Sequence, residues 1–364
     1  MREGLLLTWL SLLPRGRQIK EVLANNIERL ERLWKQEADE IQLLKKTSGK
    51  FLEGILNQDI RDLAQNAFSV VQKKGYGVLS IVQEEYPDLL KTTADAPVVL
   101  FYKGDIHCCR QCISIVGSRK ATVYGLRVAE HLSMELAAKG FCVVSGLARG
   151  IDAKAHWGAL NARGKTCAVI GSGLDVVYPP ENQKLFERIA TEGVILSEYA
   201  PGVMPLPQHF PARNRIISGL SQGLVVVEAG KQSGTLITVD FALEQGRDVF
   251  AVPGNIYSER SAGTNRLIQE GAKMVTGVED IFQEYKLEGW LSEQSVKAPT
   301  LSQETGLRGL LLETLEAGMF QLDDFVQRTN YSVQEINTEL LLLQLEGVLE
   351  KEITGEYFIK EKRK

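Results

Sequence analysis

Residues 113–122 read ISIVGSRKAT, a mostly apolar run that passes through one glycine into a basic, polar turn. Further short apolar runs follow along the chain, at 141–144, 167–170, 194–196, 224–227 and 249–252. Helical stretches such as 123–139 and 181–191 lie between them. Because these runs are apolar throughout, we expect each strand to be buried between two layers of helices. The alternation predicts an α/β fold with a Rossmann-like, doubly wound and mostly parallel sheet.

The loops that follow these strands are the expected binding site, because such sheets bind ligands at the carboxyl ends of their strands. Glycine lets a ligand approach the backbone closely. Serine hydroxyls and the first N–H groups of a helix bind anions, and guanidinium groups pair with phosphates. These features predict a set of anion-binding residues: Gly117, Ser118, Arg119, Ser145, Gly146, Arg149, Arg213, Asn214, Arg215, Ser233 and Gly234.

The pair of arginines at 213 and 215 opens a helix, where two cations repel each other unless an anion or an acid lies nearby. Glu198 is the acid that a purely structural arrangement would use. We favour a phosphate contact for at least one of the two arginines.

Lys184 and Phe186 follow the strand at 167–170 and begin the next helix. A cation beside an exposed ring suits single-stranded nucleic acid, since the cation meets a phosphate and the ring stacks on a base. Ordinary core packing of Phe186 is an equal alternative. His156 lies one turn after Asp152, and we expect a packed, hydrogen-bonded histidine there and not a catalytic one.

Two nucleotide-binding motifs are excluded by their spacing. The Gly171-Ser172-Gly173 loop has Val176 where the dinucleotide fingerprint needs its third glycine, which argues against a nicotinamide dehydrogenase. The stretch from Gly158 to Thr166 is one residue too long for a Walker P-loop. The sequence supplies no convincing nucleophile–base pair or paired metal ligands. We therefore expect no catalytic residue, cofactor or metal, and a protein that holds an extended polyanion without cleaving it.

The five cysteines are an odd number, and they favour a reducing, cytoplasmic environment over a disulfide framework. Cys142 and Cys167 lie inside apolar runs and are expected in the core. The cluster of Cys108, Cys109 and Cys112 is open to a metal or redox interpretation. It lacks a second ligand pair downstream, so we favour a turn that leads into a buried strand.

The rest of the chain divides into flanking units. Residues 1–74 predict a small α-helical domain; the apolar run at 5–13 is too short to span a bilayer and predicts a core helix. The turn around Arg15 and Arg17 is either a phosphate contact or a solvated turn. Residues 75–285 form the Rossmann-like core, 286–306 predict a linker, and 307–364 predict three helices and a hairpin, a winged-helix-like domain.

Charge separates these units. The chain has 364 residues, 24% charged residues and a net charge of −4, typical of a globular protein. Residues 279–364 carry a net charge of −8, whereas the two preceding segments are slightly positive. The would-be recognition helix at 333–346 carries three glutamates and no lysine or arginine, which argues against DNA reading there and favours a protein contact.

The loop motifs together resemble the DNA-processing protein A (DprA/Smf) family. The resemblance covers about residues 86–275, and the matching signatures are IVGSR (115–119), SGLARGID (145–152), GLD (173–175), SEY (197–199), FPARNRIIS (210–218), VEA (227–229), SGTLIT (233–238) and VPG (252–254). The flanking units also resemble the family architecture, in which the first domain is of the SAM or helix-hairpin-helix type. The Pro-Arg-Gly-Arg turn at 14–17 departs from the two-glycine turn of that type, and the cysteine cluster is not a family feature.

This resemblance implies a cytoplasmic, non-enzymatic protein that binds single-stranded DNA and loads the RecA recombinase onto it in natural transformation. It implies a homodimer formed through the core, with Arg119 and Lys184 as DNA-binding cations and Phe186 as a possible stacking ring. An enzymatic alternative is a nucleotide phosphoribohydrolase of the lysine-decarboxylase-like group. That group needs a catalytic glutamate after its glycine-rich loop, where this chain reads Leu-Ile-Thr at 236–238.

Overall fold

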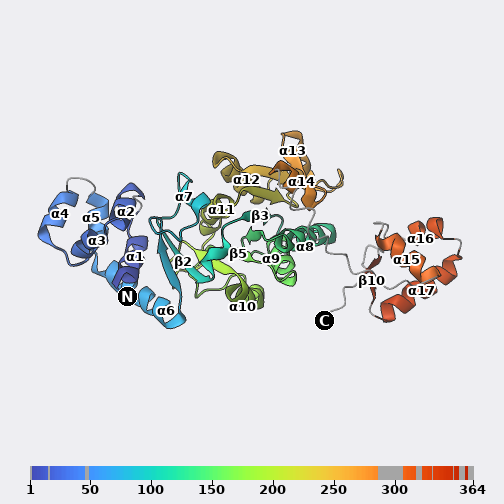
Figure 1. Ribbon diagram of the computed structural model, residues 1–364, viewed down its shortest axis with the longest axis horizontal. Coiled ribbons are helices and arrows are strands. Elements are labelled where there is room, and N and C mark those ends of the chain that lie inside the picture. Colours follow the sequence, from blue (N-terminus) through green and yellow to red (C-terminus); the bar gives the residue numbers. More distant parts are fainter. Residues whose placement is uncertain are drawn as a thin grey trace. The chain divides into compact units, whose positions relative to one another are not determined.

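The protein is described by a computed structural model in which the chain forms two compact units, Met1–Leu291 and Ser292–Lys364. The described residues are 2–14, 17–45, 49–285, 306–316, 322–329, 331–346, 348–351 and 357–359. The predicted linker at 286–306 lies outside them except for Gly306, and so does Arg15. Figure 1 follows the first unit from blue to orange and the second in red.

Six helices fill the first part of the chain: α1 (Arg2–Leu12), α2 (Arg17–Ala24), α3 (Ile27–Trp34), α4 (Ala38–Lys45), α5 (Gly49–Leu56) and α6 (Gln58–Lys74). The expected core helix is confirmed by α1, whose Trp9 and Leu10 are fully buried. Asn57 caps α6 through the backbone N–H groups of Asp59 and Ile60, and Gly75 ends the helix with a positive φ of 65°.

These helices pack onto the first strands and belong to the same compact unit as the core, so a separate domain at 1–74 stays a prediction. Arg17 makes one of the ties. Its guanidinium pairs with Glu21 at 2.6 Å and donates to the Thr93 carbonyl at 3.0 Å. Arg17 therefore has a structural role in this conformation.

The core is a single nine-stranded sheet. Its strands are β1 (Gly77–Ser80), β2 (Val99–Gly104), β3 (Cys112–Val116), β4 (Cys142–Ser145), β5 (Thr166–Ile170), β6 (Val194–Ser197), β7 (Gly223–Val226), β8 (Asp248–Ala251) and β9 (Lys273–Met274). The spatial order is β1-β2-β6-β5-β4-β3-β7-β8-β9. Every neighbouring pair from β6 to β9 in this order is parallel, whereas the β1–β2 and β2–β6 pairs are antiparallel. This confirms the predicted mostly parallel sheet.

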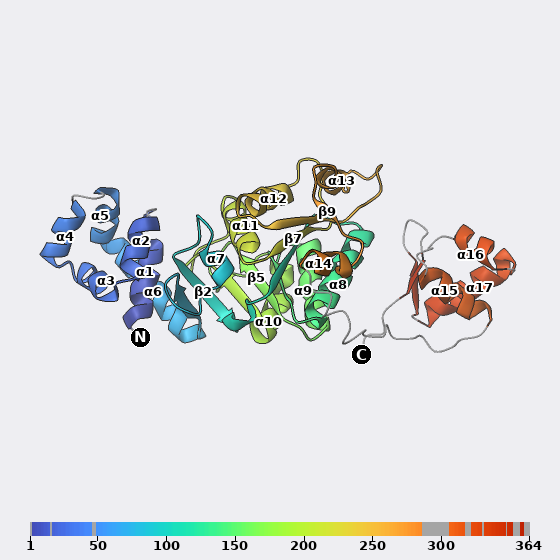
Figure 2. The same ribbon diagram turned by 45° about the horizontal axis from the view of Figure 1, so that its top comes forward.

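The connecting elements are α7 (Asp88–Lys91), η1 (Ile106–Cys108), α8 (Val123–Ala138), α9 (Ile151–Asn161), η2 (Pro180–Asn182), α10 (Gln183–Glu192), α11 (His209–Gly219), α12 (Thr235–Glu244), α13 (Ala262–Gln269) and α14 (Val278–Glu284). Helices α8, α9 and α10 lie on one face of the sheet and α11 and α12 on the other, as Figures 1 and 2 show. The inner strands are buried on every residue, which explains their apolar runs.

The winding direction reverses at β3. From β3 the chain moves outward through β4, β5 and β6, and it then returns to place β7 on the other side of β3. In doubly wound sheets, ligands bind in the crevice outside the carboxyl ends of the strands at such a switch point. The loops after β3 and β7 therefore occupy the expected position of a binding site.

The second unit contains α15 (Leu307–Glu316), α16 (Leu322–Arg328), α17 (Val333–Leu345) and the antiparallel pair β10 (Leu349–Lys351) and β11 (Tyr357–Ile359). Three helices followed by a hairpin confirm the winged-helix prediction. The predicted capping box is also present, because Ser332 and Glu335 each accept from the other's backbone N–H. Its core is made by Leu311, Phe325 and Leu340, all fully buried.

Candidate nucleic-acid interface

A buried glutamate joins the two loops at the switch point. Glu228 follows β7 and is 2% exposed. Its carboxylate accepts from the backbone N–H of Thr122 at 2.9 Å and from the Thr122 hydroxyl, and its carbonyl accepts from Ser118 N at 2.9 Å. Gly125 is needed beside it, since a Cβ there would lie 2.4 Å from the carboxyl carbon. These bonds fix the path of the loop after β3.

The loop after β3 presents its cations outward. Arg119 and Lys120 are exposed, and the Ser118 hydroxyl accepts from the backbone N–H of Lys120 at 3.1 Å. Gly150 has a φ of 75° and passes so close that a Cβ would lie 2.3 Å from the Ser118 carbonyl oxygen. The predicted residues after β3 and β4 are therefore brought together at one edge of the sheet.

Arg119 takes part in an aromatic group that was not predicted as such. Its guanidinium carbon lies 5.4 Å from the ring centroid of Phe210, at the start of α11. Phe210 lies 5.5 Å from the ring of Tyr178, which follows β5 and is 43% exposed. We call Arg119, Tyr178 and Phe210 the aromatic platform. Phe210 begins one of the quoted family motifs and Tyr178 follows another, but only the contact between the two rings shows that they form one surface.

Arg213 has a different role from the predicted one. It is 4% exposed, and its guanidinium donates to the carbonyl of Gly146 at 2.6 Å and to that of Val169. Burial lowers its pKa to about 10, and the nearby Asp152 carboxylate opposes this shift. Burial raises the pKa of Asp152 above its ordinary value, and the Arg213 charge offsets part of this shift. In this conformation Arg213 offers no exposed cation, because its donors bind the ends of β4 and β5, and its predicted phosphate contact stays a prediction.

Arg215 also bonds inside the protein. Its guanidinium pairs with Glu198 at 2.6 Å and with Asp95 at 3.3 Å, and only 14% of its side chain is exposed. The structural alternative through Glu198 is therefore the one present in this conformation, and a phosphate contact for Arg215 stays a prediction. Asn214 between the two arginines is half-buried.

Phe186 and Ser145 are corrected by their burial. Phe186 is 3% exposed, and its ring points from α10 into the core, where the Lys103 ammonium lies 5.6 Å from the ring centroid. The ring therefore offers no face to a base. The Ser145 hydroxyl is fully buried and donates to the Ile115 carbonyl at 2.7 Å. Sequence periodicity did not separate these two residues from the exposed ones, because each lies at the end of a buried element.

The other predicted residues keep an accessible position. Lys184 is exposed in the first turn of α10, and Asn182 beside it donates to the Leu147 carbonyl at 2.9 Å, which ties this turn to the loop after β4. Arg149 is 58% exposed and pairs with Glu181. Gly117 is half-buried after β3, and Gly146 is buried against Arg213. Ser233 and Gly234 precede α12 on the other helix layer, with Gly234 exposed.

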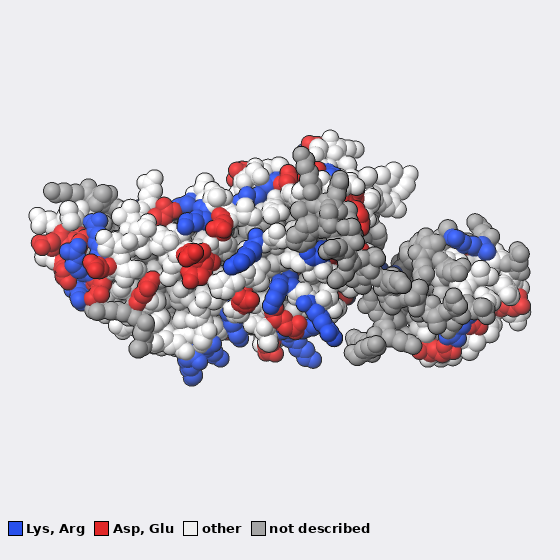
Figure 3. Space-filling view, in the orientation of Figure 1, with Lys and Arg blue, Asp and Glu red and all other residues white. Residues whose placement is uncertain are grey.

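A basic pocket of about 390 Å³ adjoins the same loop and is lined by Arg119, Lys120, Ala121, Leu126, Gly150, Ala153, Lys154 and Trp157. Lys154 pairs with Glu130 at 2.8 Å, so part of this charge is compensated. On the face drawn in Figure 3, basic side chains are interspersed with acidic ones over the first unit. Any attraction of an anion to this face therefore depends on individual cations near the binding site and not on a broad positive potential.

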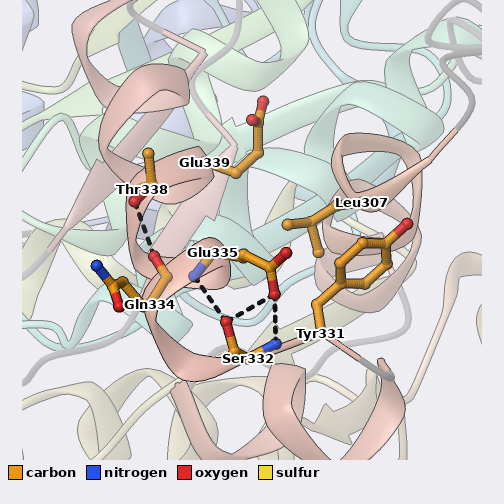
Figure 4. A pocket seen from close by; sticks show the side chains of 7 residues that line it. All are labelled: Leu307, Tyr331, Ser332, Gln334, Glu335, Thr338 and Glu339. Carbon is orange, nitrogen blue, oxygen red and sulfur yellow. Dashed lines mark hydrogen bonds between the residues drawn. The ribbon is translucent and has the colours of Figure 1, made fainter.

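The winged-helix unit offers an acidic pocket instead. It has a volume of about 420 Å³ and is lined by Leu307, Tyr331, Ser332, Gln334, Glu335, Thr338 and Glu339 (Figure 4). Arg308 on α15 pairs with Glu346 and lies 3.7 Å from Glu339. Carboxylates on this face repel DNA phosphates, so the expectation of a protein contact stands as a prediction.

No helix among the described residues is both long enough and apolar enough to cross a membrane. The fold and the carboxyl edge together define a doubly wound α/β protein that carries cations and aromatic rings at its switch point. Comparison with known families then assigns it. Residues 77–286 match the family described as DNA recombination-mediator protein A, and residues 295–352 match the DprA winged helix domain. The chain belongs to the DNA recombination-mediator protein A family, known as DprA or Smf.

Individual relatives agree with this assignment. DNA processing protein DprA of Bacillus subtilis (strain 168) is 46% identical over 215 residues, which cover 58% of this chain and 72% of that protein. The X-ray structure of DprA from Streptococcus pneumoniae is 39% identical with a TM-score of 0.66, and the match covers 78% of this chain and 98% of that one. DprA of Helicobacter pylori, whose structure is described by its single-stranded DNA binding mode, is 30% identical with a TM-score of 0.53 over 58% of this chain and 96% of that one.

Proposed function

We propose that the chain binds single-stranded DNA along the carboxyl edge of its parallel strands. The observation that carries the proposal is the aromatic platform, in which a guanidinium and two rings from three loops share one surface. Rings at such a surface stack on bases, and the adjoining cations meet the phosphates between them. Lys184 and Lys120 supply exposed cations on neighbouring loops.

Single strands suit this edge better than duplexes. Stacking on an aromatic ring needs an unpaired base, because the faces of bases inside a duplex are already stacked on their neighbours. The relative from Helicobacter pylori, described by its single-stranded DNA binding, supports the same ligand class. The bonds that hold the loops from inside, through Glu228 and Arg213, give the edge a fixed shape before DNA arrives.

The test measures the binding of labelled single-stranded and double-stranded oligonucleotides across a salt series. Arg119→Ala and Lys184→Ala are each expected to weaken single-strand binding about tenfold and to lower the salt slope by about 0.7, the value for one lost phosphate contact on a single strand. The matched control is Lys165→Ala, an exposed lysine directly before β5, at the opposite end of the strands. Equal losses in all three variants would contradict the placement of the DNA, and no single-strand binding by the wild type would contradict the function.

On this basis we infer a cytoplasmic recombination mediator without catalytic activity that loads RecA on incoming DNA during natural transformation. Pull-down of RecA by the full chain, and faster RecA filament formation on DNA coated with single-strand-binding protein, are the expected results. Filament formation that is no faster with the protein than without it would contradict this role. Nucleotide hydrolysis by the purified protein would favour the phosphoribohydrolase alternative.

We also propose a homodimer formed through the core. Large apolar side chains are exposed on α12 and after β8: Leu243 is 62% exposed, Ile256 80% and Tyr257 90%. Apolar groups left at a surface in this way are typical of a contact with another chain. Light scattering coupled to gel filtration is expected to give twice the monomer mass of 40.4 kDa, and Leu243→Glu to reduce it. A monomeric wild type at micromolar concentration would contradict this proposal.

A further inference from the structure

All five cysteines of the chain meet at the amino ends of three neighbouring strands. Cys112 is the first residue of β3 and Cys142 the first of β4, and the two are register partners in the parallel ladder. Cys167 is the second residue of β5. Cys108 and Cys109 lie in the short turn that leads into β3 and covers these strand ends.

The sulfur atoms lie close together. The Sγ atoms of Cys108, Cys109 and Cys142 are all within 4.8 Å of one another, and those of Cys108 and Cys142 are 3.9 Å apart. Cys112 is the register partner of Cys142 and follows Cys109 by three positions, so it adds a fourth buried thiol beside this group. Four thiolates around a Zn²⁺ ion at bonds of about 2.3 Å would have sulfur atoms about 3.8 Å apart, which matches the shortest separation here.

Simple packing accounts for this cluster less well. Thiols in plain contact have similar separations, so the distance alone decides nothing. What packing leaves unexplained is the gathering of every cysteine from three separate segments, whereas the buried amino end of the neighbouring β6 has Val194 and Ile195. Cys108 is half-buried while its three neighbours are buried, which gives an ion a route from solvent to the inner thiols.

We propose that Cys108, Cys109, Cys112 and Cys142 form a structural site for a thiophilic divalent cation, Zn²⁺ in the first instance. Thiolates are the ligands that such ions prefer, and four of them complete a closed tetrahedral site. Binding forms four metal–sulfur bonds, and the four thiol protons pass to solvent. The ion pins the turn at 106–109 to the ends of β3 and β4.

Charge at this end of the sheet favours the bound ion. Four thiolates around Zn²⁺ carry a net charge of −2, which needs nearby cations if it is to stay buried. On each strand of the cluster a basic residue precedes the cysteine by two or three positions: Arg110 before Cys112, Lys139 before Cys142 and Lys165 before Cys167.

The experiment uses the full chain, purified under argon without chelators, and measures metal content and Co²⁺ absorption. We expect one tightly held Zn²⁺ per chain, and an intense charge-transfer band with tetrahedral d–d bands when Co²⁺ replaces it. Cys108→Ser and Cys142→Ala are expected to weaken Zn²⁺ binding by more than about tenfold, because the loss of a hydrogen-bonding partner of a ligand already costs about that much. Cys167→Ala is the matched control, because its register partner on β4 is Val144, two positions further along the strand than Cys142, and this variant is expected to retain the ion.

Three results would overturn the proposal. One is a wild type that neither retains Zn²⁺ nor gives the Co²⁺ bands. Another is equal metal retention in Cys108→Ser and the wild type. The third is a Cys108–Cys142 disulfide in the protein as isolated, found by mass mapping. A far-UV spectrum recorded for each variant separates loss of the ion from loss of the fold, and unchanged single-stranded DNA binding by folded variants keeps this test independent of the proposed function.

Discussion

The two ends of the parallel strands are built from different chemistry. At the carboxyl ends, exposed Arg119 lies on a glycine-containing loop and exposed Lys184 lies in the first turn of α10, while buried polar side chains hold the loops from inside. At the amino ends the same strands begin with buried thiols. The strands between these two ends are similar apolar segments. The difference in chemistry between the ends therefore shows that the loops at the two ends of a doubly wound sheet can serve unrelated functions. Variants at one end should therefore spare the function of the other.

The largest expected effect comes from the buried cation of the carboxyl end. Arg213→Met removes the donors that bind Gly146 and Val169 and leaves Asp152 buried without its cation. We expect a loss of about 3–5 kcal/mol in the free energy of unfolding, the usual cost of breaking a buried pair. Urea unfolding followed by far-UV dichroism measures it.

The matched variants separate the ion pair from simple loss of volume. Arg213→Met combined with Asp152→Asn should recover part of the lost stability, since the uncompensated carboxylate is then gone. Arg119→Ala, an exposed arginine at the same end, should change stability by no more than about 0.5 kcal/mol. A destabilisation of the same size in Arg119→Ala would remove the distinction between inward and outward cations.

Near the amino ends of the strands lies a buried histidine, His156, and we expect it to make the stability of the protein depend on pH. His156 is fully buried, and its Nδ1 lies 2.7 Å from the Thr166 hydroxyl, which itself donates to the Val143 carbonyl. Nδ1 therefore carries the proton in the neutral ring. Burial, with a smaller effect from the Arg213 charge, lowers the pKa of His156 to about 3.

Because this pKa is below its unfolded value of about 6.5, the unfolded state binds the extra proton first. Stability is complete above about pH 6.5 and should fall as the pH drops toward 3, by about 1.4 kcal/mol per unit from this residue. Unfolding midpoints of the wild type and His156→Gln between pH 4 and pH 8 measure the difference. Parallel curves for the two proteins would contradict a neutral, buried His156.

A third prediction tests which aromatic ring meets DNA. Phe210→Ala should weaken binding to single-stranded DNA by about 1–3 kcal/mol, the range for one lost base-stacking contact, with little change in salt slope. Phe186→Leu should leave DNA binding unchanged and reduce only stability, because that ring is in the core. An abasic oligonucleotide should bind Phe210→Ala and the wild type equally. Equal losses of DNA binding in both variants would contradict the aromatic platform.

The smallest expected effect is a gain. Arg149 is paired with Glu181, and both are exposed at the carboxyl end. Glu181→Gln should release the Arg149 guanidinium for contact with a phosphate and tighten single-strand binding. Because exposed ion pairs are weak, the gain should be only about twofold to fivefold at low salt. Glu192→Gln breaks the Arg188 pair at the other end of α10 and should leave DNA binding unchanged. Weaker binding by Glu181→Gln, measured by the same titration, would mean that Glu181 positions Arg149 for DNA.

Much of this fold could be predicted because each strand and helix is marked by residues close together in the sequence. Each inner strand is an apolar run, and each helix of the winged-helix unit has its own cap or period, so no distant information was needed. The glycine-rich loops could likewise be placed at one edge from the order of strands and helices. What could not be predicted is the direction in which polar side chains point. Arg119 and Arg213 have the same chemistry in sequence, yet only the surrounding carbonyls make one of them internal.

Contacts between segments were missed for the same reason. Tyr178 and Phe210 are 32 positions apart, and no periodicity links them. The cysteine cluster of the sequence lacks a second local pair of ligands, and the further thiol that lies close to it, Cys142, comes from the neighbouring strand β4. Parallel sheets bring such residues together only through long crossovers, which sequence spacing does not reveal.

The position of β3 between β4 and β7 has a consequence for synthesis on the ribosome. β3, β4, β5 and β6 leave the exit tunnel before β7, which begins at Gly223. Until then one edge of β3 has no partner, and Ile113 and Ile115 lie beside an open strand edge that invites aggregation. Glu228, which fixes the loop after β3, emerges later still. The nascent chain thus acquires protection from misassociation, and the loop arrangement of its carboxyl edge, late in translation.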